Sequence, residues 1–559
     1  MSVAAWLNTA WMRKCGLEGA AFARASRGVA RAQAELLRQI VRANRDSAFG
    51  TIHRFADVTD PRTYQRRVPP GSYEDFAGPI RWIFSGEANV LTREPVRLLE
   101  PTSGTSGGEK LIPYTEGLRR QFQRGVAAWI ADLFRHRPLV RRGRAFWSIS
   151  PALGPRRITA GGIPIGFADD ASYLGSLERL ALDRLLVVPG EVARLTDSIA
   201  FRYATLLALL RADDLALISV WSPTFLTALL GPLPRWADRL CHDLRRGTFQ
   251  PPAPVPPEIA PRLRGRPDPR RAGRLAAVFR RASSLPEMLA EVWPGLALIS
   301  CWADAAAARC VREVRELFPA IEIQPKGLLA TEGCVSLPLT GRPAPVLALR
   351  SHFFEFQEGD TDECRLAHKL QEDGRYRVVL TTGGGFYRYR LGDEVEVMGF
   401  EGVCPLVRFL GKADRVSDLV GEKLAEPHVR SVLDRVFAAH GLTPRFALLV
   451  PVMGCPSRYC LFLQETSVPS ALLLDVQRGL EDNPYYKHAT GLGQLAPVEM
   501  RLLDPAGESG WLVFQRHCEA RGAKAGTVKP TALDAWTGWS EEFRPLVAGK
   551  GEPGPSGPG

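Results

Sequence analysis

Residues Leu99-Glu-Pro-Thr-Ser-Gly-Thr-Ser-Gly-Gly-Glu-Lys-Leu-Ile-Pro113 form the most informative segment of this sequence. Between Thr102 and Gly108 it combines serine and threonine hydroxyls with glycines, and Lys110 follows shortly after. Glycine lets a backbone approach a ligand closely, and successive backbone N–H groups with nearby hydroxyls form an anion-binding concavity. A lysine adds a mobile positive charge suited to phosphate. The segment therefore predicts a loop that binds polyphosphate.

This segment is not a Walker A loop. Counted from Gly104, that pattern needs glycine, lysine and then serine or threonine at the positions of Glu109-Lys-Leu111. A Gly/Ser run also suits a surface loop that binds no ligand. The rest of the chain has to decide between these two interpretations.

Length and composition are those of a multidomain globular protein. The 559 residues exceed one typical hydrophobic core, and 45% hydrophobic with 24% charged residues is ordinary, so two or more domains are expected. No window of about 18 uninterrupted apolar residues occurs, so no membrane span is expected. The N-terminus lacks a secretory signal and the ten cysteines form no Cys-x-x-Cys pair, so we expect a cytoplasmic protein with reduced thiols.

The net charge of +12 is compatible with nucleic acid, a membrane surface or small anions as partners. The densest basic stretch, Arg262–Arg274, lacks the interleaved aromatic residues of a nucleic-acid-binding surface. We interpret this stretch as a solvated connection and expect no nucleic acid partner. The oligomeric state has no signal in the sequence.

Short apolar runs alternate with segments of helical periodicity along most of the chain. Leu215–Trp221 is typical of a buried strand, and Leu118–Phe134 has apolar residues at helical spacing. This alternation predicts an α/β architecture. Near the N-terminus we expect one helix over residues 20–45, an irregular segment over 59–78, and a strand over 91–99 that leads into the Ser/Gly segment.

A second cluster, Gly327-Leu-Leu-Ala-Thr-Glu-Gly333, follows a short apolar run. A hydroxyl such as that of Thr331 beside a carboxylate such as that of Glu332 can bind a phosphate and its magnesium ion together. A plain turn that binds no ligand has the same composition. This cluster therefore supports a nucleotide site only in combination with others.

A third cluster, Leu380-Thr-Thr-Gly-Gly-Gly-Phe-Tyr-Arg-Tyr-Arg-Leu-Gly-Asp393, is more specific. From Tyr387 onward, aromatic or apolar residues alternate with arginine or glycine, which predicts a strand. Asp393 can accept two hydrogen bonds from ribose hydroxyls, as acidic residues do in other nucleotide sites. In the alternative interpretation this is a solvated strand end, with Arg388 and Arg390 facing water.

The C-terminal part has the pattern of a separate small domain. Residues 405–426 combine two strand-like arms, a turn that contains Lys412, and the start of a helix, which is typical of a domain junction. Strand and helix patterns follow and predict a small α/β unit. Lys529 lies in a Gly-containing loop near its end, where a mobile lysine can reach a phosphate or a carboxylate. A solvated loop is the alternative.

Taken together, the clusters resemble the Gretchen Hagen family of acyl acid amido synthetases. This family is part of the adenylate-forming superfamily of acyl-CoA synthetases, luciferases and peptide-synthetase adenylation domains. Thr102–Pro113, Leu328–Glu332 and Phe386–Asp393 look like three ordered nucleotide motifs of the family. The resemblance extends from about Gln33 to Pro530. It implies an α/β fold with a large multi-sheet N-terminal adenylating domain and a small, mobile α/β C-terminal domain.

The resemblance also implies how the chain is divided. Residues 1–411 would bind ATP and the acyl acid, residues 412–545 would form the mobile lid, and residues 546–559 would be a disordered tail. Two features depart from the family pattern. Leu328 stands where the family has a tyrosine near the adenine, and Leu419–Glu426 replaces an aspartate-rich hinge.

Roles for single residues follow from the same resemblance. Lys110, Glu332 and Lys529 would be catalytic, with Glu332 as the ligand of Mg²⁺ and Lys529 in contact with the reacting carboxylate and the α-phosphate. Asp393 would bind the ribose. The residues implied to bind ATP are Thr102, Ser103, Gly104, Thr105, Ser106, Thr331, Asp393 and Lys412.

The implied reaction joins a carboxylic acid to an amino acid or another amine. ATP and Mg²⁺ would activate the acid as acyl-AMP, with release of pyrophosphate, and the amine would then form an amide. An acyl-CoA ligase and a non-catalytic nucleotide-binding protein of this fold are the alternatives. Ile149–Phe167 and Trp221–Phe225 are candidates to line the acid pocket. Trp221 and Phe225 favour an apolar or aromatic acid, and ordinary core packing is the alternative.

Overall fold

The computed structural model describes residues 2–102, 110–148, 157–166, 184–304, 307–359, 361–412, 415–454, 456–521, 523, 526 and 528–543. The fold divides into two compact units. The first is built from residues 1–411 together with 522–528, and the second from residues 412–521 and 529–559. The chain therefore passes from one unit to the other three times.

Helices form the N-terminal part of the first unit. They are α1 (Val3–Ala25), α2 (Val29–Ala43), α3 (Ala48–Ile52), the 3-10 turn η1 (Phe55–Asp57), α4 (Pro61–Arg67) and α5 (Tyr73–Phe84). The expectation of one helix over residues 20–45 is wrong. The backbone N–H of Ser26 closes the last turn of α1, and Gly28 starts a new helix as the N-cap of α2.

The expectation of an irregular segment over residues 59–78 is also wrong. Asp60 caps α4 by accepting a hydrogen bond from the backbone N–H of Thr63, and Pro61 fits the first helical turn. Ser72 and Asp75 form a capping box at the start of α5. The prolines and turn residues of this segment are therefore helix-start signals.

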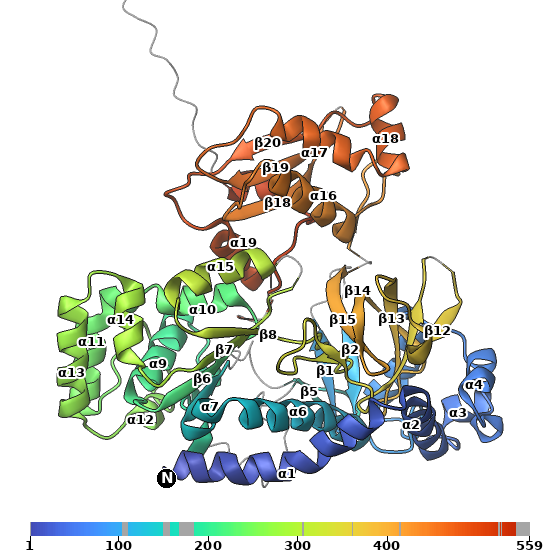
Figure 1. Cartoon of the computed structure of the whole chain (residues 1–559), viewed down its shortest axis with the longest axis horizontal. Coiled ribbons are helices and arrows are strands. Elements are labelled where there is room, and N and C mark those ends of the chain that lie inside the picture. The colour runs from blue at the N-terminus through green and yellow to red at the C-terminus, as the bar shows by residue number, and fades with distance from the viewer. Residues whose placement is uncertain are drawn as a thin grey trace, which may run out of the picture. The chain divides into compact units, whose positions relative to one another are not determined.

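A four-stranded sheet follows, in the order β2-β1-β5-β4. Its strands are β1 (Leu98–Thr102), β2 (Lys110–Tyr114), β4 (Arg157–Ile158) and β5 (Pro164–Ile165). The strand expected over residues 91–99 begins only at Leu98. Before it the chain bends, and the Thr92 hydroxyl donates to the Glu94 carbonyl at 2.8 Å. The helix expected over 118–134 is confirmed as α6 (Glu116–His136), which runs alongside α1 and leads to α7 (Pro138–Arg142) (Figure 1).

The largest sheet of the first unit has seven strands in the order β12-β11-β13-β14-β15-β10-β9. They are β9 (Ser336–Leu337), β10 (Val346–Leu347), β11 (Phe353–Gln357), β12 (Cys364–Leu366), β13 (Arg375–Thr381), β14 (Tyr389–Glu401) and β15 (Cys404–Lys412), with the 3-10 turn η4 (Ala367–Lys369) after β12. Gln33 on α2 joins the helices to this sheet. Its amide donates to the carbonyls of Leu349 and His352 and accepts from the N–H of Phe354.

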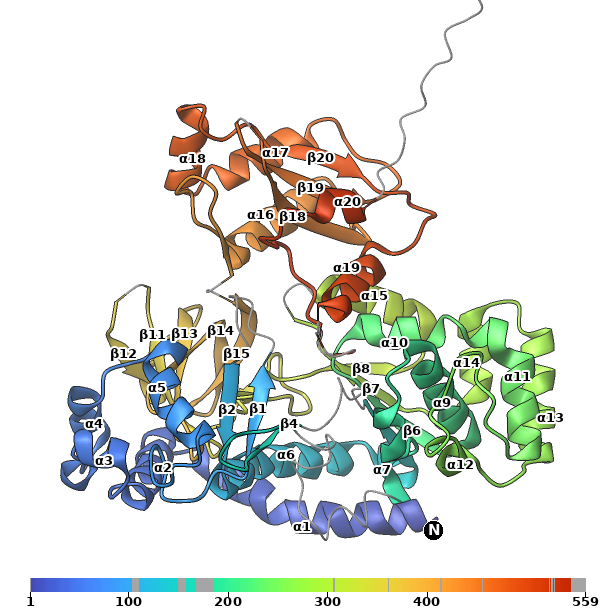
Figure 2. The same cartoon turned by 180° about the vertical axis from the view of Figure 1, so that it is seen from behind.

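A parallel sheet in the order β3-β6-β7-β8 forms the other half of the first unit. Its strands are β3 (Arg144–Trp147), β6 (Leu215–Ser219), β7 (Leu298–Cys301) and β8 (Glu322–Pro325). Helices flank it in both views (Figures 1 and 2). They are η3 (Gly190–Arg194), α9 (Ser198–Arg211), α10 (Pro223–Leu230), α11 (Leu233–Arg246), α12 (Ala260–Leu263), α13 (Pro269–Arg281), α14 (Leu285–Val292) and α15 (Ala307–Leu317). Because the strands are parallel, their carboxyl ends meet at one edge, where α/β proteins usually bind ligands.

The basic stretch Arg262–Arg274 is only partly a solvated connection. Its second half belongs to α13, and Arg271 is buried. The Arg271 guanidinium donates hydrogen bonds to the carbonyls of Leu210 at 3.1 Å and Val292 at 2.8 Å. This arginine therefore holds helix ends together inside the unit.

The second unit contains a hairpin, a three-stranded sheet and helices. The hairpin strands are β16 (Val416–Ser417) and β17 (Leu424–Ala425), and the sheet strands are β18 (Phe446–Val452), β19 (Arg458–Gln464) and β20 (Glu499–Leu502). The helices are α16 (Glu426–Ala439), α17 (Leu472–Leu480), α18 (Pro484–Gly491), α19 (Gly510–Ala520) and α20 (Trp539–Glu542). Across the described parts of both units, no helix is long and apolar enough to cross a membrane.

Candidate functional site

The hairpin of β1 and β2 carries the Ser/Gly segment. Thr102 is the last residue of β1 and pairs directly with Lys110, the first residue of β2. The two ends of the segment are therefore held side by side by strand pairing. Ser103, Gly104, Thr105 and Ser106 lie outside the described residues.

Tyr73 on α5 fixes the start of β2. Its hydroxyl accepts a hydrogen bond from the N–H of Leu111 at 2.8 Å, and its ring lies 5.6 Å from the Lys110 ammonium, measured to the ring centroid. The pKa of the neighbouring Glu74 is lowered mainly by hydrogen bonds from its own N–H and Ser72, and also by the charge of Lys110. The Lys110 ammonium therefore lies near an aromatic ring and near enough to the Glu74 carboxylate to influence its pKa.

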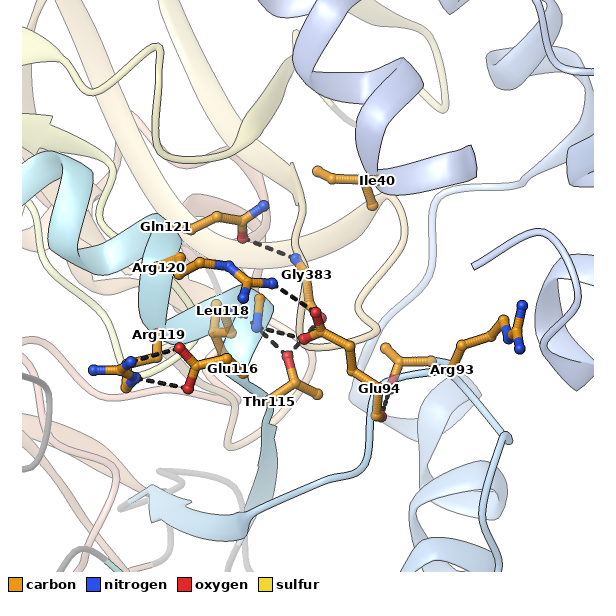
Figure 3. A network of polar contacts seen from close by, with 12 residues as sticks. Ile40, Arg93, Glu94, Thr115, Glu116, Leu118, Arg119, Arg120, Gln121 and Gly383 are labelled. Carbon is orange, nitrogen blue, oxygen red and sulfur yellow. Dashed lines mark hydrogen bonds and ion pairs between the residues drawn. The ribbon is translucent and has the colours of Figure 1, made fainter. Parts of the chain in front are cut away.

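The start of α6 is joined to the glycine-rich turn of the third cluster, a connection that the sequence analysis missed (Figure 3). The hydroxyl of Thr115, the N-cap of α6, donates to the Gly383 carbonyl at 2.8 Å. Gln121, on the second turn of this helix, accepts from the Gly383 N–H at 2.8 Å. Glu94 accepts from the Gly117 N–H at 2.6 Å and pairs with Arg120 (Figure 3). An acidic residue near a helix N-terminus is favourable, so these contacts fix where α6 begins.

Glycines allow the turn to approach α6 this closely. A Cβ on Gly383 would lie 2.9 Å from the Gly117 backbone, and one on Gly384 would lie 2.7 Å from the Pro113 carbonyl oxygen. Gly385 has a φ of 102°, which favours glycine. The Gly-Gly-Gly run therefore has a packing role in this fold.

Glu332 lies in a tight turn after β8 and is buried, with 8% of its surface exposed. Ala330 and Gly333 exchange backbone hydrogen bonds across the turn. The Tyr389 hydroxyl donates to Glu332 Oε1 at 3.4 Å. The structure thus brings the second and third sequence clusters together through these two side chains. Leu328 belongs to the core around the large sheet, which is an apolar packing role.

His352 supports this turn from behind, and the sequence analysis did not find it. Its Nε2 accepts from the Cys334 N–H at 3.0 Å, so its Nδ1–H donates to Gln121 Oε1 at 3.0 Å. Burial, together with the charge of Arg124, lowers the pKa of His352 to about 3, so the ring is neutral. Gln121 therefore joins the Glu332 turn, through His352, to the turn at Gly383. The only sequence signal was a histidine before an apolar run.

The interpretation of Arg388 as a solvent-facing residue is wrong. Arg388 is buried and pairs with the buried carboxylate of Glu355, at 2.9 Å. It also donates to the carbonyls of Gln65 and Val68. Arg388 has a φ of 50°, which is not a strand conformation, and β14 begins only at Tyr389. The strand alternation expected from Tyr387 onward therefore does not include Arg388. Arg390, in contrast, forms a more exposed pair with Asp362.

Asp393 lies on β14 and is fully buried. Between Tyr389 and Asp393 the pairing of β14 with β13 shifts register, and Gly392 has a φ of 77°, so the strand bulges just before Asp393.

Lys412 and Lys529 belong to the second unit. Lys412 is the last residue of β15. The segment after Lys529 is anchored inside the second unit, because the Ala532 N–H donates to the buried Glu426 at 3.2 Å and the Ala532 carbonyl accepts from Leu449. The hydrogen bond to Glu426 therefore helps to position the segment that follows Lys529.

Comparison with known families gives two matches in chain order. Residues 19–323 match the model of the GH3 family N-terminal domain, and residues 345–412 match that of the GH3 family central domain. The first match alone spans more than half of the chain. The chain belongs to the GH3 family. GH3 abbreviates Gretchen Hagen, so the resemblance found in the sequence is confirmed.

Curated GH3 relatives resemble this chain over most of its length. A probable indole-3-acetic acid-amido synthetase of Oryza sativa subsp. japonica is 25% identical over 460 residues, which cover 74% of each chain. A jasmonoyl–L-amino acid synthetase of Nicotiana attenuata is 23% identical and covers 77% of this chain and 78% of its own. Among solved structures, a GH3.15 acyl acid amido synthetase in complex with 2,4-DB has a TM-score of 0.80 at 18% identity and covers 95% of both chains. This likeness confirms the predicted multi-sheet α/β fold.

The GH3 matches do not cover every candidate residue. Thr102, Lys110 and Asp393 lie within the matched segments. Glu332 lies between the two segments, and Lys529 lies beyond both. The contact of Glu332 with Tyr389 is therefore structural information that the family match does not contain.

Proposed function

We propose that this GH3 protein is an ATP-dependent acyl acid amido synthetase. The carboxylate of an acid attacks the α-phosphate of ATP, so that a C–O–P bond forms and pyrophosphate leaves. The nitrogen of an amino acid or another amine then attacks the acyl carbon, AMP leaves, and the amine loses a proton. Family membership and the printed names of the curated relatives support this assignment.

The observation that carries the proposal is the hydrogen bond between Tyr389 and Glu332. The two residues are 57 positions apart in the chain, and the family resemblance implies that their clusters serve one nucleotide. In the folded unit a buried carboxylate and the strand that carries Asp393 lie together, as a shared nucleotide site requires. Glu332 is the metal-binding and catalytic residue of this proposal, Thr331 contacts the α-phosphate, and Asp393 binds the ribose.

The phosphates of ATP are assigned to the hairpin segment. Thr102 and Lys110 stand at its two ends, and the intervening Ser103–Ser106 are assigned the remaining hydroxyl and backbone contacts. Donors aimed at charge that develops on the phosphates would stabilise the transition state. Lys110 is the mobile cation of this set.

The described residues fit Mg²⁺ in one specific way. They contain no group of three or more histidine, cysteine, aspartate or glutamate side chains arranged to hold a metal ion. Magnesium is usually held by one or two carboxylates together with substrate phosphates and water. Glu332 would therefore be its one protein carboxylate, and the ion would neutralise phosphate charge during attack.

The second unit is assigned the role of a mobile lid. In this proposal residues 412–545 close over the nucleotide bound by residues 1–411, and the tail expected over 546–559 lies outside the described residues. Lys529 contacts the reacting carboxylate and the α-phosphate, and Lys412 reaches the nucleotide from the junction. Closure followed by rotation would present a new face for acyl transfer. We expect this chemistry in the cytoplasm.

Pyrophosphate release tests the proposal. The full chain is incubated with ATP and Mg²⁺ and with a panel of aryl, indole and fatty acids, each with and without mixed amino acids. We expect release that depends on an acid, is stimulated by amino acids and yields an amide by mass spectrometry. Glu332→Gln should abolish it, while the exposed Glu372→Gln should not.

Two results would favour other functions. A thioester formed only when CoA is added, with no amide, would identify an acyl-CoA ligase. ATP binding without release for any acid of the panel would favour a non-catalytic nucleotide-binding protein.

A further inference from the structure

One side of α1 is apolar and exposed to solvent. Val3, Trp6 and Leu17 expose 69%, 63% and 79% of their surface, and Ala10 between them is also exposed. These four residues, the α1 stripe, recur at intervals of three, four and seven residues, so they share one side of the helix. At a rise of about 1.5 Å per residue the stripe extends over roughly 20 Å. Scattered exposed apolar residues are normal, whereas a continuous row of them marks a contact surface.

The opposite side of α1 holds the helix on the first unit. Cys15 belongs to a core cluster with residues of α6, and the Trp11 ring lies 5.9 Å from that of Phe134, measured between centroids. A Cβ on Gly19 would lie 3.1 Å from the Cβ of Ala131, so the two helices are in close contact there. Figures 1 and 2 show α1 along the outer edge of this unit, with α6 on its inner side. A helix that is apolar on all sides is normally buried, so the composition of α1 predicts a further partner for its exposed side.

Positive charges border the α1 stripe. Arg13 and Lys14 precede Leu17 by four and three residues, so they lie on either side of it, and both are exposed. Further exposed basic residues follow at the end of the helix and just after it, at Arg24 and Arg27. Glu18 is the single acidic residue of α1, and its carboxylate pairs with the Arg350 guanidinium. The exposed side of the helix is therefore both apolar and basic.

We propose that the α1 stripe binds the surface of an anionic phospholipid bilayer. The helix would lie parallel to the membrane, with Trp6 and Leu17 at the boundary between headgroups and acyl chains. Arg13 and Lys14 would extend sideways to the lipid phosphates. These two charges lie in the middle of the helix, so α1 would rest on the bilayer without crossing it. The net charge of +12 adds attraction to an anionic surface. This inference goes beyond the proposed reaction, which uses none of these residues.

The charges favour a bilayer over two other partners. In a dimer with two-fold symmetry the same patch lies on both subunits, so the basic residues of both copies would share one interface. A nucleic acid would match the charge, but its phosphate backbone would leave the α1 stripe in water. An anionic bilayer supplies negative charge and an apolar layer together.

Flotation of the full chain with lipid vesicles tests the proposal. Vesicles of phosphatidylglycerol and phosphatidylcholine in equal parts are compared with vesicles of phosphatidylcholine alone, at low and at high salt. We expect binding to the anionic vesicles to be about tenfold stronger or more, and to weaken with salt. The double variant Trp6→Gln with Leu17→Gln should lower the partition coefficient about tenfold or more, because it removes the apolar contact. Arg13→Gln with Lys14→Gln should do the same by removing charge.

The matched controls carry the same kinds of change elsewhere on the first unit. Trp82→Gln with Ile52→Gln replaces an exposed tryptophan and an exposed aliphatic residue. Arg62→Gln with Arg66→Gln removes two exposed charges from α4. Both control variants should bind the anionic vesicles like the wild type. Thermal unfolding should show that all four double variants are folded, since every substituted residue is exposed.

Several results would overturn the proposal. They are no binding to the anionic vesicles at low salt, equal binding to the neutral vesicles, unaltered binding by either folded α1 variant, and an equal loss in the control variants. Sedimentation equilibrium without lipid examines the second copy as the partner. A dimer that dissociates when Trp6 and Leu17 are replaced would assign the α1 stripe to a subunit interface and would likewise overturn the proposal.

Discussion

The hydroxyl of Tyr389 donates a hydrogen bond to the buried carboxylate of Glu332, at 3.4 Å. The ring of the same tyrosine stacks on Phe386, with 4.3 Å between centroids. Stacking fixes the ring, and the ring in turn fixes the direction of the carboxylate. Glu332 is therefore positioned by the cluster that carries Asp393.

Tyr389→Phe should slow pyrophosphate release about tenfold while the fold is retained. The substitution removes the hydrogen bond to Glu332 but keeps the stacked ring, and a hydrogen bond typically contributes about 0.5–1.5 kcal/mol. Steady-state kinetics and thermal unfolding measure the two effects. Tyr376→Phe is the matched control, since it removes the hydroxyl of another buried tyrosine, which accepts from the Gln371 N–H. Equal rates for both variants would contradict a positioning role of Tyr389.

Gln121→Leu should lower the free energy of unfolding by about 3 kcal/mol, because it leaves the buried His352 Nδ1–H and the Gly383 N–H without their acceptor. Urea titration followed by circular dichroism measures this loss. Gln39→Leu, at an exposed position on α2, should change the free energy by less than about 0.5 kcal/mol. A similar loss for both variants would indicate that the hydrogen bonds of Gln121 add nothing to the free energy of unfolding.

Acid should destabilise the protein through His352. The pKa of this buried ring is lowered to about 3 from an ordinary value of 6.5. Between these values the unfolded chain binds a proton that the folded chain does not. The contribution of the neutral His352 ring to the free energy of unfolding is therefore complete above pH 6.5 and is lost as the pH falls towards 3. The loss is at most about 1.4 kcal/mol per pH unit. Urea titrations at several pH values should show a shallower dependence for His352→Asn than for the wild type. The exposed His488→Asn should follow the wild type.

Arg388→Met should cost about 3–5 kcal/mol, because it leaves the Glu355 carboxylate buried without its partner. Burial raises the pKa of Glu355 and Arg388 opposes that rise, so the loss should shrink when the variant is unfolded at low pH, where the carboxyl is protonated. Arg390→Met removes the neighbouring, more exposed pair with Asp362 and should cost less than about 1 kcal/mol. Chemical denaturation of both variants makes the comparison. Equal costs would show that burial does not distinguish the pairs.

Lys326→Met should make the protein more stable, by about 1–2 kcal/mol at neutral pH. Burial lowers the pKa of Lys326 from 10.5 to about 8, so the folded state carries an unfavourable charge that methionine lacks. One pKa unit corresponds to about 1.4 kcal/mol, which partial exposure reduces. Over the range from pH 10.5 down to pH 8, the unfolded wild-type chain binds a proton at Lys326 that the folded chain does not. The free energy of unfolding of the wild type should therefore fall over this range, and its difference from that of the variant should grow. A destabilised variant would indicate that the contacts of Lys326 with the hydroxyls of Ser219 and Ser300 and with two indoles outweigh its burial.

The sequence predicted the parts of the fold that depend on local patterns. Apolar periodicity identified α6, which buries one face, and a continuous apolar run identified β6, which is buried along its whole length. It failed at residues 59–78, where Asp60-Pro61 and Ser72 are helix-start signals that resemble loop composition. It also failed at Arg388, because a buried arginine needs a partner such as Glu355, which is 33 residues away and unrelated in pattern.

The candidate site shows the same division. Glu332 and Asp393 were identified from short motifs, and their clusters are joined through Tyr389 in the fold. Gln121 and His352 were missed because each looks like an ordinary polar residue until the fold brings them within 3.0 Å. Lys326 was missed for a related reason, since its setting comes from three strands and two helical or loop tryptophans distant in sequence.

The return of residues 522–528 to the first unit has a consequence for dissecting this protein. A truncated chain that ends at residue 411 would lack residues 522–528, which group with the first unit. An isolated fragment from residue 412 onward would carry these residues without the first unit. To express the first unit alone, residues 1–411 would therefore have to be joined to residues 522–528. An exchange of the second unit between relatives would have to transfer residues 412–521 and 529–559 together.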